Sequence, residues 1–189
     1  MMRISLFALP LVLLATALPV AAFLALLSWS LVRSGNVPGG FLINVNLGEI
    51  NIEPGLAPLF TTNTIDGEKI TLSELRGQVV MITFWASWCP PCRQEASALV
   101  QVHEEYQSAV KFIGIDIWDH EKDARNYIDV FHVSYPNILD TNGRIAIDYG
   151  VTGIPETHFI DAAGNLVHKF VGPLNQARLR AILDDMLMQ

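Results

Sequence analysis

Apolar and polar residues follow one another in blocks along this chain of 189 residues. The first block, residues 4–32, contains no charged side chain and consists mainly of Leu, Ala, Val and Phe. As a helix, it exceeds the roughly 20 residues that are needed to cross the hydrocarbon core of a bilayer. The pattern therefore predicts an N-terminal transmembrane signal-anchor over residues 1–33.

A cleaved signal peptide is the alternative interpretation of this block. Val20-Ala21-Ala22 is an acceptable cleavage site. The apolar part of a signal peptide spans about 7–15 residues, however, and this chain stays apolar from Phe23 through Val32. We therefore favour an uncleaved anchor. The sequence gives little indication of its orientation in the membrane, because one arginine flanks the apolar block on each side, Arg3 before it and Arg33 after it.

Residues 34–54 are rich in Gly, Pro and Asn and carry few charges, which is typical of a linker. Within this segment, residues 41–47 form either a short strand or a stretch that lies along the membrane surface. We expect residues 55–189 to form one folded domain, because domains usually contain about 100–150 residues.

The domain shows strand-like and helix-like patterns in alternation. Residues 79–85 are uniformly apolar, which is typical of a strand buried on both faces. The other expected strands are 59–64, 69–72, 110–118, 137–139, 157–160 and 166–171. The expected helices are 73–77, 93–106, 122–132, 145–149 and a last one that is capped by Asn175 and packs inward through Leu179, Ile182, Leu183 and Leu187. Strands separated by helices, with a closing hairpin and helix, predict an α/β sandwich with a mixed sheet.

The charge of the chain narrows the range of partners. Arg3 and Arg33 flank the apolar block, which leaves 10 basic residues against 19 acidic ones and a charge near −9 for the rest of the chain. An acidic surface of this kind argues against nucleic acid and against anionic lipid headgroups as partners.

The two cysteines of the chain, Cys89 and Cys92, lie three positions apart between the strand 79–85 and the helix that follows it. The N–H groups and the macrodipole at a helix N-terminus stabilise an anion, so Cys89 should ionise more readily than a free thiol. The thiolate is the attacking species in disulfide exchange, and Cys92 is near enough to close the ring and release a partner. Pro91 suits a first helical turn, where its missing N–H costs nothing.

Three other interpretations of this motif are weaker. A structural disulfide would close a very small loop and constrain the unfolded chain little. Haem attachment needs a histidine directly after the second cysteine, where Arg93 stands. Half of a zinc site would need further ligands, and the histidines show no paired ligand spacing: His103, His120, His132, His158 and His168. The motif thus predicts a redox-active disulfide, with no metal and no other cofactor.

A second landmark, residues 150–157, lies about 65 positions beyond the cysteines and contains Pro155 just before an expected strand. A proline cannot donate to a strand ladder, so it must stand at the start of that strand. If the Ile154–Pro155 bond is cis, the turn exposes the backbone of Ile154 for pairing with an extended partner chain. An ordinary turn proline is the alternative, and the sequence does not choose between the two.

These motifs carry a family resemblance. Residues 55–188 resemble the thioredoxin fold and, more narrowly, the membrane-anchored, extracytoplasmic TlpA-, ResA- and DsbE/CcmG-like thiol-disulfide oxidoreductases. The matching segments are residues 84–95, 135–136, 140, 143, 149–157, 160–161 and 171–174. The resemblance implies a thioredoxin-like three-layer sandwich with a mixed sheet, an N-terminal β-hairpin extension and a central helix/strand insertion. One transmembrane helix would precede it, with the domain on the extracytoplasmic face of the cell membrane.

The resemblance also implies roles for individual residues. Cys89 would be the nucleophile and Cys92 the resolving thiol, opposite a cis Pro155. The residues expected to contact the substrate are Trp88, Pro90, Pro91, Ile154 and Glu156. The expected task is that of a reductant in cytochrome c maturation, acting on apocytochrome c or on haem-ligation proteins and re-reduced by a membrane electron-donor thiol protein.

This chain differs from cytoplasmic thioredoxins at a position that bears on proton transfer. Cytoplasmic thioredoxins carry a buried Asp six positions before the first cysteine, whereas this chain has Thr83 there. Glu95 matches an acidic position of the ResA-like branch, and a partly buried carboxylate beside a thiol raises the pKa of that thiol and can relay its proton. A favourable charge in the first helical turn is the other interpretation of Glu95.

Two other functions use the same cysteines. A thiol peroxidase needs a Thr three positions before its reactive cysteine, where this chain has Ala86. A copper chaperone would use the two cysteines as soft ligands together with a distal histidine, and His158 is the histidine near the Pro155 turn.

Overall fold

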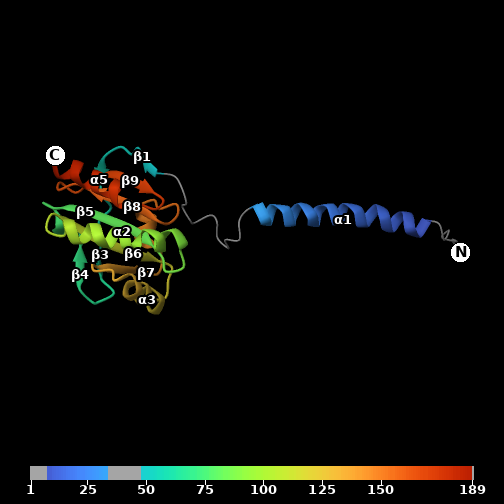
Figure 1. Cartoon of the computed structure of the whole chain (residues 1–189), viewed down its shortest axis with the longest axis horizontal. Coiled ribbons are helices and arrows are strands. Elements are labelled where there is room, and N and C mark those ends of the chain that lie inside the picture. The colour runs from blue at the N-terminus through green and yellow to red at the C-terminus, as the bar shows by residue number, and fades with distance from the viewer. Residues whose placement is uncertain (1–7, 34–47, 189) are drawn as a thin grey trace. The chain divides into compact units, whose positions relative to one another are not determined.

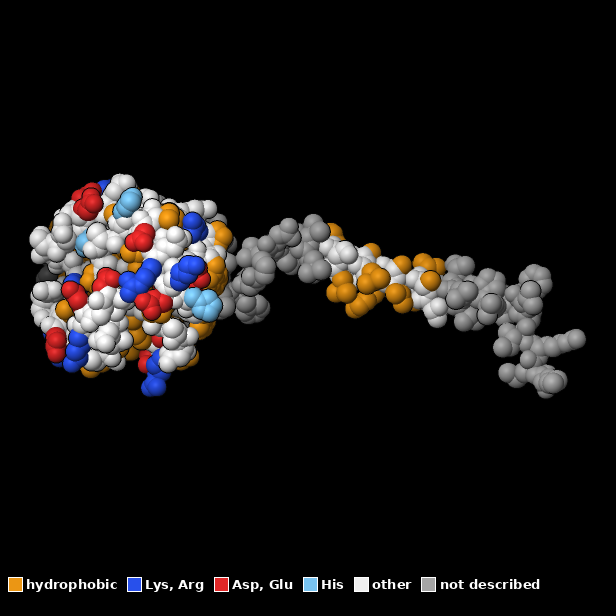
Figure 2. Space-filling view, turned by 90° about the horizontal axis from the view of Figure 1, so that it is seen from below, with side chains coloured by type: hydrophobic (Ala, Val, Ile, Leu, Met, Phe, Trp, Pro, Cys, Tyr) orange, Lys and Arg blue, Asp and Glu red, His pale blue; other side chains and the backbone are white. Residues whose placement is uncertain are grey.

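The computed structural model describes residues 8–33 and 48–188, and in the first range it describes the side chains of residues 16–29. The chain divides into two compact units, residues 1–40 and 41–189. The first unit contains helix α1 (Ala8–Arg33), in which Pro19 is an internal residue. Apolar side chains are exposed along this helix (Figure 2).

A search of the described residues finds no helix long and apolar enough to cross a membrane. The signal-anchor over residues 1–33 stays a prediction. The predicted short strand or surface segment at residues 41–47 lies outside the described residues.

The second unit is built on one sheet with the strand order β1-β9-β8-β5-β6-β7, in which β2 also pairs with β9 (Figure 1). The strands are β1 (Gly48–Ile50), β2 (Gly55–Leu56), β3 (Thr61–Asn63), β4 (Lys69–Thr71), β5 (Val79–Trp85), β6 (Val110–Ile117), β7 (Asn137–Asp140), β8 (Glu156–Ile160) and β9 (Asn165–Val171). The helices are η1 (Leu72–Leu75), α2 (Pro90–Tyr106), α3 (Glu121–Phe131), α4 (Arg144–Asp148) and α5 (Gln176–Met188).

The sheet is mixed, as predicted. β5 pairs in parallel with β6, and β6 in parallel with β7, whereas β8 is antiparallel to both β5 and β9. Every residue of β5 is buried, which is the result of its uniformly apolar sequence and its place inside the sheet. The predicted N-terminal hairpin is β3–β4, and the predicted central insertion is α3 with β7.

Two adjacent residues at the end of β5 show that helices cover both faces of the sheet. Trp85 stacks on Tyr127 of α3, with ring centroids 4.1 Å apart. Phe84 meets Tyr149, the residue that follows α4. Because successive side chains of a strand point to opposite faces, α3 and α4 lie on opposite sides. α2 packs against both α3 and α5, so these three helices share the face of Trp85 and form the third layer (Figure 1).

Two sequence predictions need correction. β1 lies inside the predicted linker 34–54 and pairs with β9 through Gly48↔Val171, so the boundary placed at residue 55 falls within the paired region. β1 and β2 are too short to show a strand pattern and are held by the edge of β9. In α5, Leu187 is 42 % exposed, and Met186 packs inward instead.

Candidate redox-active site

Cys89 and Cys92 form a disulfide at the start of α2, directly after the loop that leaves β5. Cys89 is the N-cap residue of the helix, and its Sγ accepts a hydrogen bond from the backbone N–H of Cys92 at 3.2 Å. The helix begins at Pro90, before the expected range 93–106 but in agreement with the prediction that Pro91 suits its first turn, because a first turn needs no donor from Pro90 or Pro91. A sulfur in this position is ready to be stabilised as an anion by the helix N-terminus.

Both cysteines are fully buried in this disulfide form. Of the residues predicted to contact the substrate, Trp88 is 43 % exposed and Pro90 is also exposed, whereas Pro91 is buried. The residues on either side of the buried Cys89, Trp88 and Pro90, are therefore both exposed. An attacking thiol has to reach past them, or the loop has to move.

The Ile154–Pro155 peptide bond is cis, as the family resemblance implies. The antiparallel register Phe84↔Glu156 sets Pro155 beside the end of β5, from which the cysteine loop departs. Ile154 itself has no exposed surface. The expectation that its backbone is exposed for pairing is therefore wrong for this form.

Glu95 lies one helical turn beyond Cys92 on α2 and is 3 % exposed. Its Oε2 accepts a hydrogen bond from the backbone N–H of Leu174 at 2.7 Å. Its Oε1 is buried, and none of the described residues forms a hydrogen bond with it. Burial raises the pKa of Glu95 to about 8, against the opposing effect of the Leu174 hydrogen bond. A groove lined by Gln94, Ala98 and residues 173–177 opens beside this carboxyl group. Glu95 therefore tends to hold a proton near the disulfide at neutral pH.

We predict that Glu95→Gln changes how stability depends on pH. The carboxyl group is protonated when folded up to about pH 8 but ionises near pH 4.5 when unfolded. Its burial therefore costs more stability as pH rises between these values, on the order of 1 kcal/mol for each pH unit. Gln does not titrate, so the stability of the variant relative to that of the wild type should increase from pH 5 to pH 8. Above pH 8 this difference in stability should not change further. Urea unfolding across this pH range measures the difference in unfolding free energy between the two proteins. A difference that does not change with pH would refute the prediction.

Glu156, for which a substrate-contact role was predicted, is fully buried in this structure. Its carboxylate is fully buried, with Oε1 2.7 Å from Nε2 of His158 and 2.7 Å from Nζ of Lys169. Burial is the main cause that lowers the pKa of His158. Phe84 and Tyr149 pack around the His158 ring, which places this buried charge cluster on the sheet face opposite α2. His158 is therefore separated by the sheet from the two cysteines.

Several residues around the site were missed by the sequence analysis. Tyr127 donates a hydrogen bond from its hydroxyl to the carbonyl of Cys92 at 2.9 Å. Asp119 accepts one from the backbone N–H of Ser87 at 2.7 Å, in the loop before Cys89. Asp119 follows a buried strand, and polar residues at the carboxyl ends of neighbouring parallel strands meet at one edge, which is the signal that would have identified it.

At the position where cytoplasmic thioredoxins have a buried Asp, Thr83 lies 3.4 Å from the hydroxyl of Thr157. This pair carries no charge, so Glu95 is the buried carboxyl group on α2 that stands near the cysteines. Within the described part of the chain, no group of three or more His, Cys, Asp or Glu side chains is arranged to hold a metal ion.

Comparisons with known proteins agree on one kind of chemistry. The model of the AhpC/TSA family matches residues 55–169. The thioredoxin-like protein YneN of Bacillus subtilis is 32 % identical over 140 residues, which cover 72 % of this chain and 82 % of that protein. A DsbE homologue of Paracoccus denitrificans, named a thiol:disulfide interchange protein, is 38 % identical over 62 % of this chain and 65 % of its own length.

The thiol-disulfide oxidoreductase ResA of Bacillus thuringiensis is 28 % identical over 67 % of this chain and 74 % of its own length. Among solved structures, a thioredoxin-family thiol:disulfide interchange protein from Chlorobium tepidum matches with a TM-score of 0.65 and 34 % identity. The match covers 73 % of this chain and 99 % of that one.

Proposed function

Since the chain belongs to the AhpC/TSA family and is a thiol-disulfide oxidoreductase of the ResA and DsbE type, we propose that it reduces protein disulfides during cytochrome c maturation. The proposed substrates are apocytochrome c or haem-ligation proteins. In the same proposal, residues 1–33 anchor the protein in the cell membrane, the domain lies on the extracytoplasmic face, and a membrane thiol protein supplies the electrons.

The observation that carries the proposal is the Cys89–Cys92 pair, whose first sulfur caps α2. In the dithiol form, the thiolate of Cys89 attacks one sulfur of the partner's disulfide. A new sulfur–sulfur bond forms, the partner's bond breaks, and its second sulfur leaves as a thiolate that takes up a proton. Cys92 then attacks Cys89 and releases the partner's other thiol. Two electrons have passed to the partner, and the protein ends with the Cys89–Cys92 disulfide.

Glu95 supports the direction of this reaction. For Cys92 to attack, it must lose its proton. The carboxyl group of Glu95, which lies on the same helix, accepts that proton only in its ionised form, and burial disfavours this form below about pH 8. Once Glu95 is ionised, its negative charge also disfavours a nearby thiolate and thereby destabilises the ionised dithiol form. A less stable dithiol form makes the pair a better reductant, since strong oxidases owe their potential to a stabilised reduced form.

Neither of the other two functions gains support from the structure. The position that a peroxidase would use for Thr is occupied by Ala86, which is buried and has no hydroxyl group. The histidine that a copper site would need, His158, bonds to Glu156 on the opposite face of the sheet.

The reduction potential of the Cys89/Cys92 pair tests the reductant assignment. We expect a value nearer to the about −270 mV of thioredoxin than to the about −120 mV of a strong oxidase. The alkylation rate of the reduced protein gives the pKa of Cys89, for which we expect about 7 or higher. A potential near that of the oxidase, together with a thiol pKa near ~3.5, would show that the protein oxidises its partners instead.

A further inference from the structure

Trp118 is an exposed aromatic residue that the exchange reaction described above does not use. It directly follows β6 and is 46 % exposed. Its φ is 55°, in the left-handed region that bulky side chains rarely adopt. Within the described residues the other non-glycine residue of positive φ is His132, where the C-cap of α3 accounts for it. Trp118 ends no helix, and unexplained backbone strain of this kind concentrates at functional sites.

The indole ring of Trp118 packs against Gly143, the residue before α4. A Cβ at Gly143 would lie 2.7 Å from Nε1 of Trp118, so the ring occupies the space that a side chain at position 143 would need. The loop after β7 therefore supports the ring on one side, while much of the side chain faces solvent. A ring that is already held in place loses little freedom when a partner contacts it.

Trp118 lies at the edge of the sheet from which the cysteine loop departs. β5, β6 and β7 are parallel neighbours, and Ser87, Trp118 and Gly143 all follow their carboxyl ends. The backbone N–H of Ser87 donates to Oδ2 of Asp119 at 2.7 Å, which joins the loop before Cys89 to the loop that contains Trp118. In sheets with parallel strands, ligands bind beyond the carboxyl ends of these strands. A polypeptide docked at Cys89 therefore extends along the edge where Trp118 is exposed.

The surroundings of the ring favour a cationic side chain. Among the aromatic side chains, indole attracts a cation most strongly. Three of the five residues that follow Trp118 are acidic, namely Asp119, Glu121 and Asp123. Arg93, whose guanidinium donates to the carbonyl of Ser87, lies over the ring of Phe131 at 5.1 Å. Within residues 48–188 no cation lies over the ring of Trp118, so the ring is open to one from a partner.

We propose that Trp118 is a specificity-determining residue for disulfide exchange, which receives a lysine or arginine side chain of the partner. Neighbouring strands lie about 4.8 Å apart, so the ends of β5 and β7 are separated by about 10 Å. An extended chain covers this distance in roughly three residues. The basic residue therefore stands about three positions from the partner's attacked cysteine. The inference rests on the proposed function, because it concerns a partner that docks at the same cysteines.

The experiment measures how fast the reduced full chain attacks two synthetic peptides. Each peptide carries one cysteine in a disulfide with thionitrobenzoate and a test residue three positions away on both sides, so that either chain direction brings one to Trp118. The test residue is lysine in one peptide and norleucine, which has the same carbon chain without the ammonium group, in the other. The thiolate of Cys89 attacks the peptide's sulfur, a Cys89–peptide disulfide forms, and thionitrobenzoate leaves as a coloured thiolate.

The readout is the ratio of the two rates, lysine peptide over norleucine peptide. Trp118→Asn removes the ring, and Asn tolerates a left-handed backbone. We expect the ratio to be about two- to fivefold higher in the wild type than in Trp118→Asn, as a cation–π contact at an exposed site implies. The acidic charge of the chain attracts lysine in both proteins and therefore cancels in this comparison.

Two further variants complete the experiment. Trp118→Phe keeps an aromatic ring and should retain part of the lysine preference. The matched control is Leu56→Asn, because Leu56 is an exposed apolar residue on β2, at the opposite end of the sheet from the cysteine loop. This control should keep the wild-type ratio.

The inference is overturned if the ratios of the wild type and Trp118→Asn agree within about 1.5-fold, or if Leu56→Asn lowers the ratio equally. A ring that only supports the fold would also leave the ratio unchanged, because its removal would slow the attack on both peptides alike. The proposed function fails by a different result, namely a reduced wild-type protein that passes no electrons to protein disulfides.

Discussion

A Cys92→Ser variant should remain covalently joined to its partner after the first exchange step, with turnover reduced by roughly 10³-fold or more. The reason is chemical: Cys89 still attacks, but a serine hydroxyl at position 92 does not displace the partner's sulfur. Cys89 retains its place as the N-cap residue of α2, since the hydrogen bond comes from the backbone N–H of residue 92. The adduct is measured on a non-reducing gel, and mass spectrometry identifies the partner.

Cys89→Ser is the matched control for this experiment. It removes the attacking sulfur and should give neither turnover nor an adduct. Capture of an apocytochrome or a haem-ligation protein by Cys92→Ser would support the assignment to cytochrome c maturation. Normal turnover in either single variant would contradict the mechanism, because both sulfurs take part in every cycle.

Lys169→Met should destabilise the protein by about 3 kcal/mol or more, since it leaves a buried charge without its partner. Glu156 is fully buried, and its Oε1 lies 2.7 Å from the ammonium group of Lys169 and from the ring of His158. Removing Lys169 leaves the carboxylate with His158, which burial keeps from ionising readily. Urea unfolding at pH 7 measures the loss.

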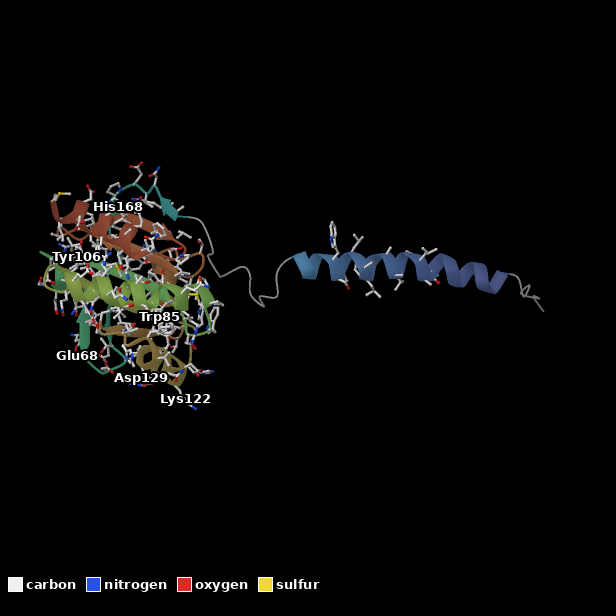
Figure 3. All side chains as sticks on the ribbon, viewed as in Figure 1. Glu68, Trp85, Tyr106, Lys122, Asp129 and His168 are labelled. Atoms are coloured by element: carbon white, nitrogen blue, oxygen red, sulfur yellow. A yellow bond between two sulfur atoms is a disulfide. The ribbon has the colours of Figure 1, made fainter. Side chains whose placement is uncertain are left out.

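The double variant Glu156→Gln/Lys169→Met shows how much of the lost stability is due to the unpaired charge and how much to the lost packing of the Lys169 side chain. It removes the carboxylate as well and should recover most of the stability lost in the single variant. Lys122→Met is the surface control (Figure 3), because Lys122 is exposed on α3, and its effect should stay within about 0.5 kcal/mol. A loss below 1 kcal/mol for Lys169→Met would mean that the pair is not needed to hold Glu156 in the core.

Acidic and basic side chains are interspersed on the face shown in Figure 2, without a large block of one sign. The chain is acidic overall, and some of its acidic side chains form ion pairs, such as Glu105 with Arg180.

Local patterns in the sequence determined most of the fold. The run Val79–Trp85 predicted β5 to the residue, because a strand buried on both faces is apolar at every position. The spacing of Cys89 and Cys92 before a helix predicted the redox pair for the same local reason: a helix N-terminus stabilises a sulfur anion wherever it occurs.

Only the tertiary structure shows which side chains are buried around Cys89 and Cys92 and in the sheet beside them. Glu156 follows Pro155 and was expected at the surface, yet the pairing of β8 with β5 and β9 directs it into the core beside Lys169. Asp116 is buried beside Trp85 because β5 and β6 align in register. The burial and ionisation of a side chain depend on neighbours that are distant in sequence, and local periodicity carries no information about those neighbours.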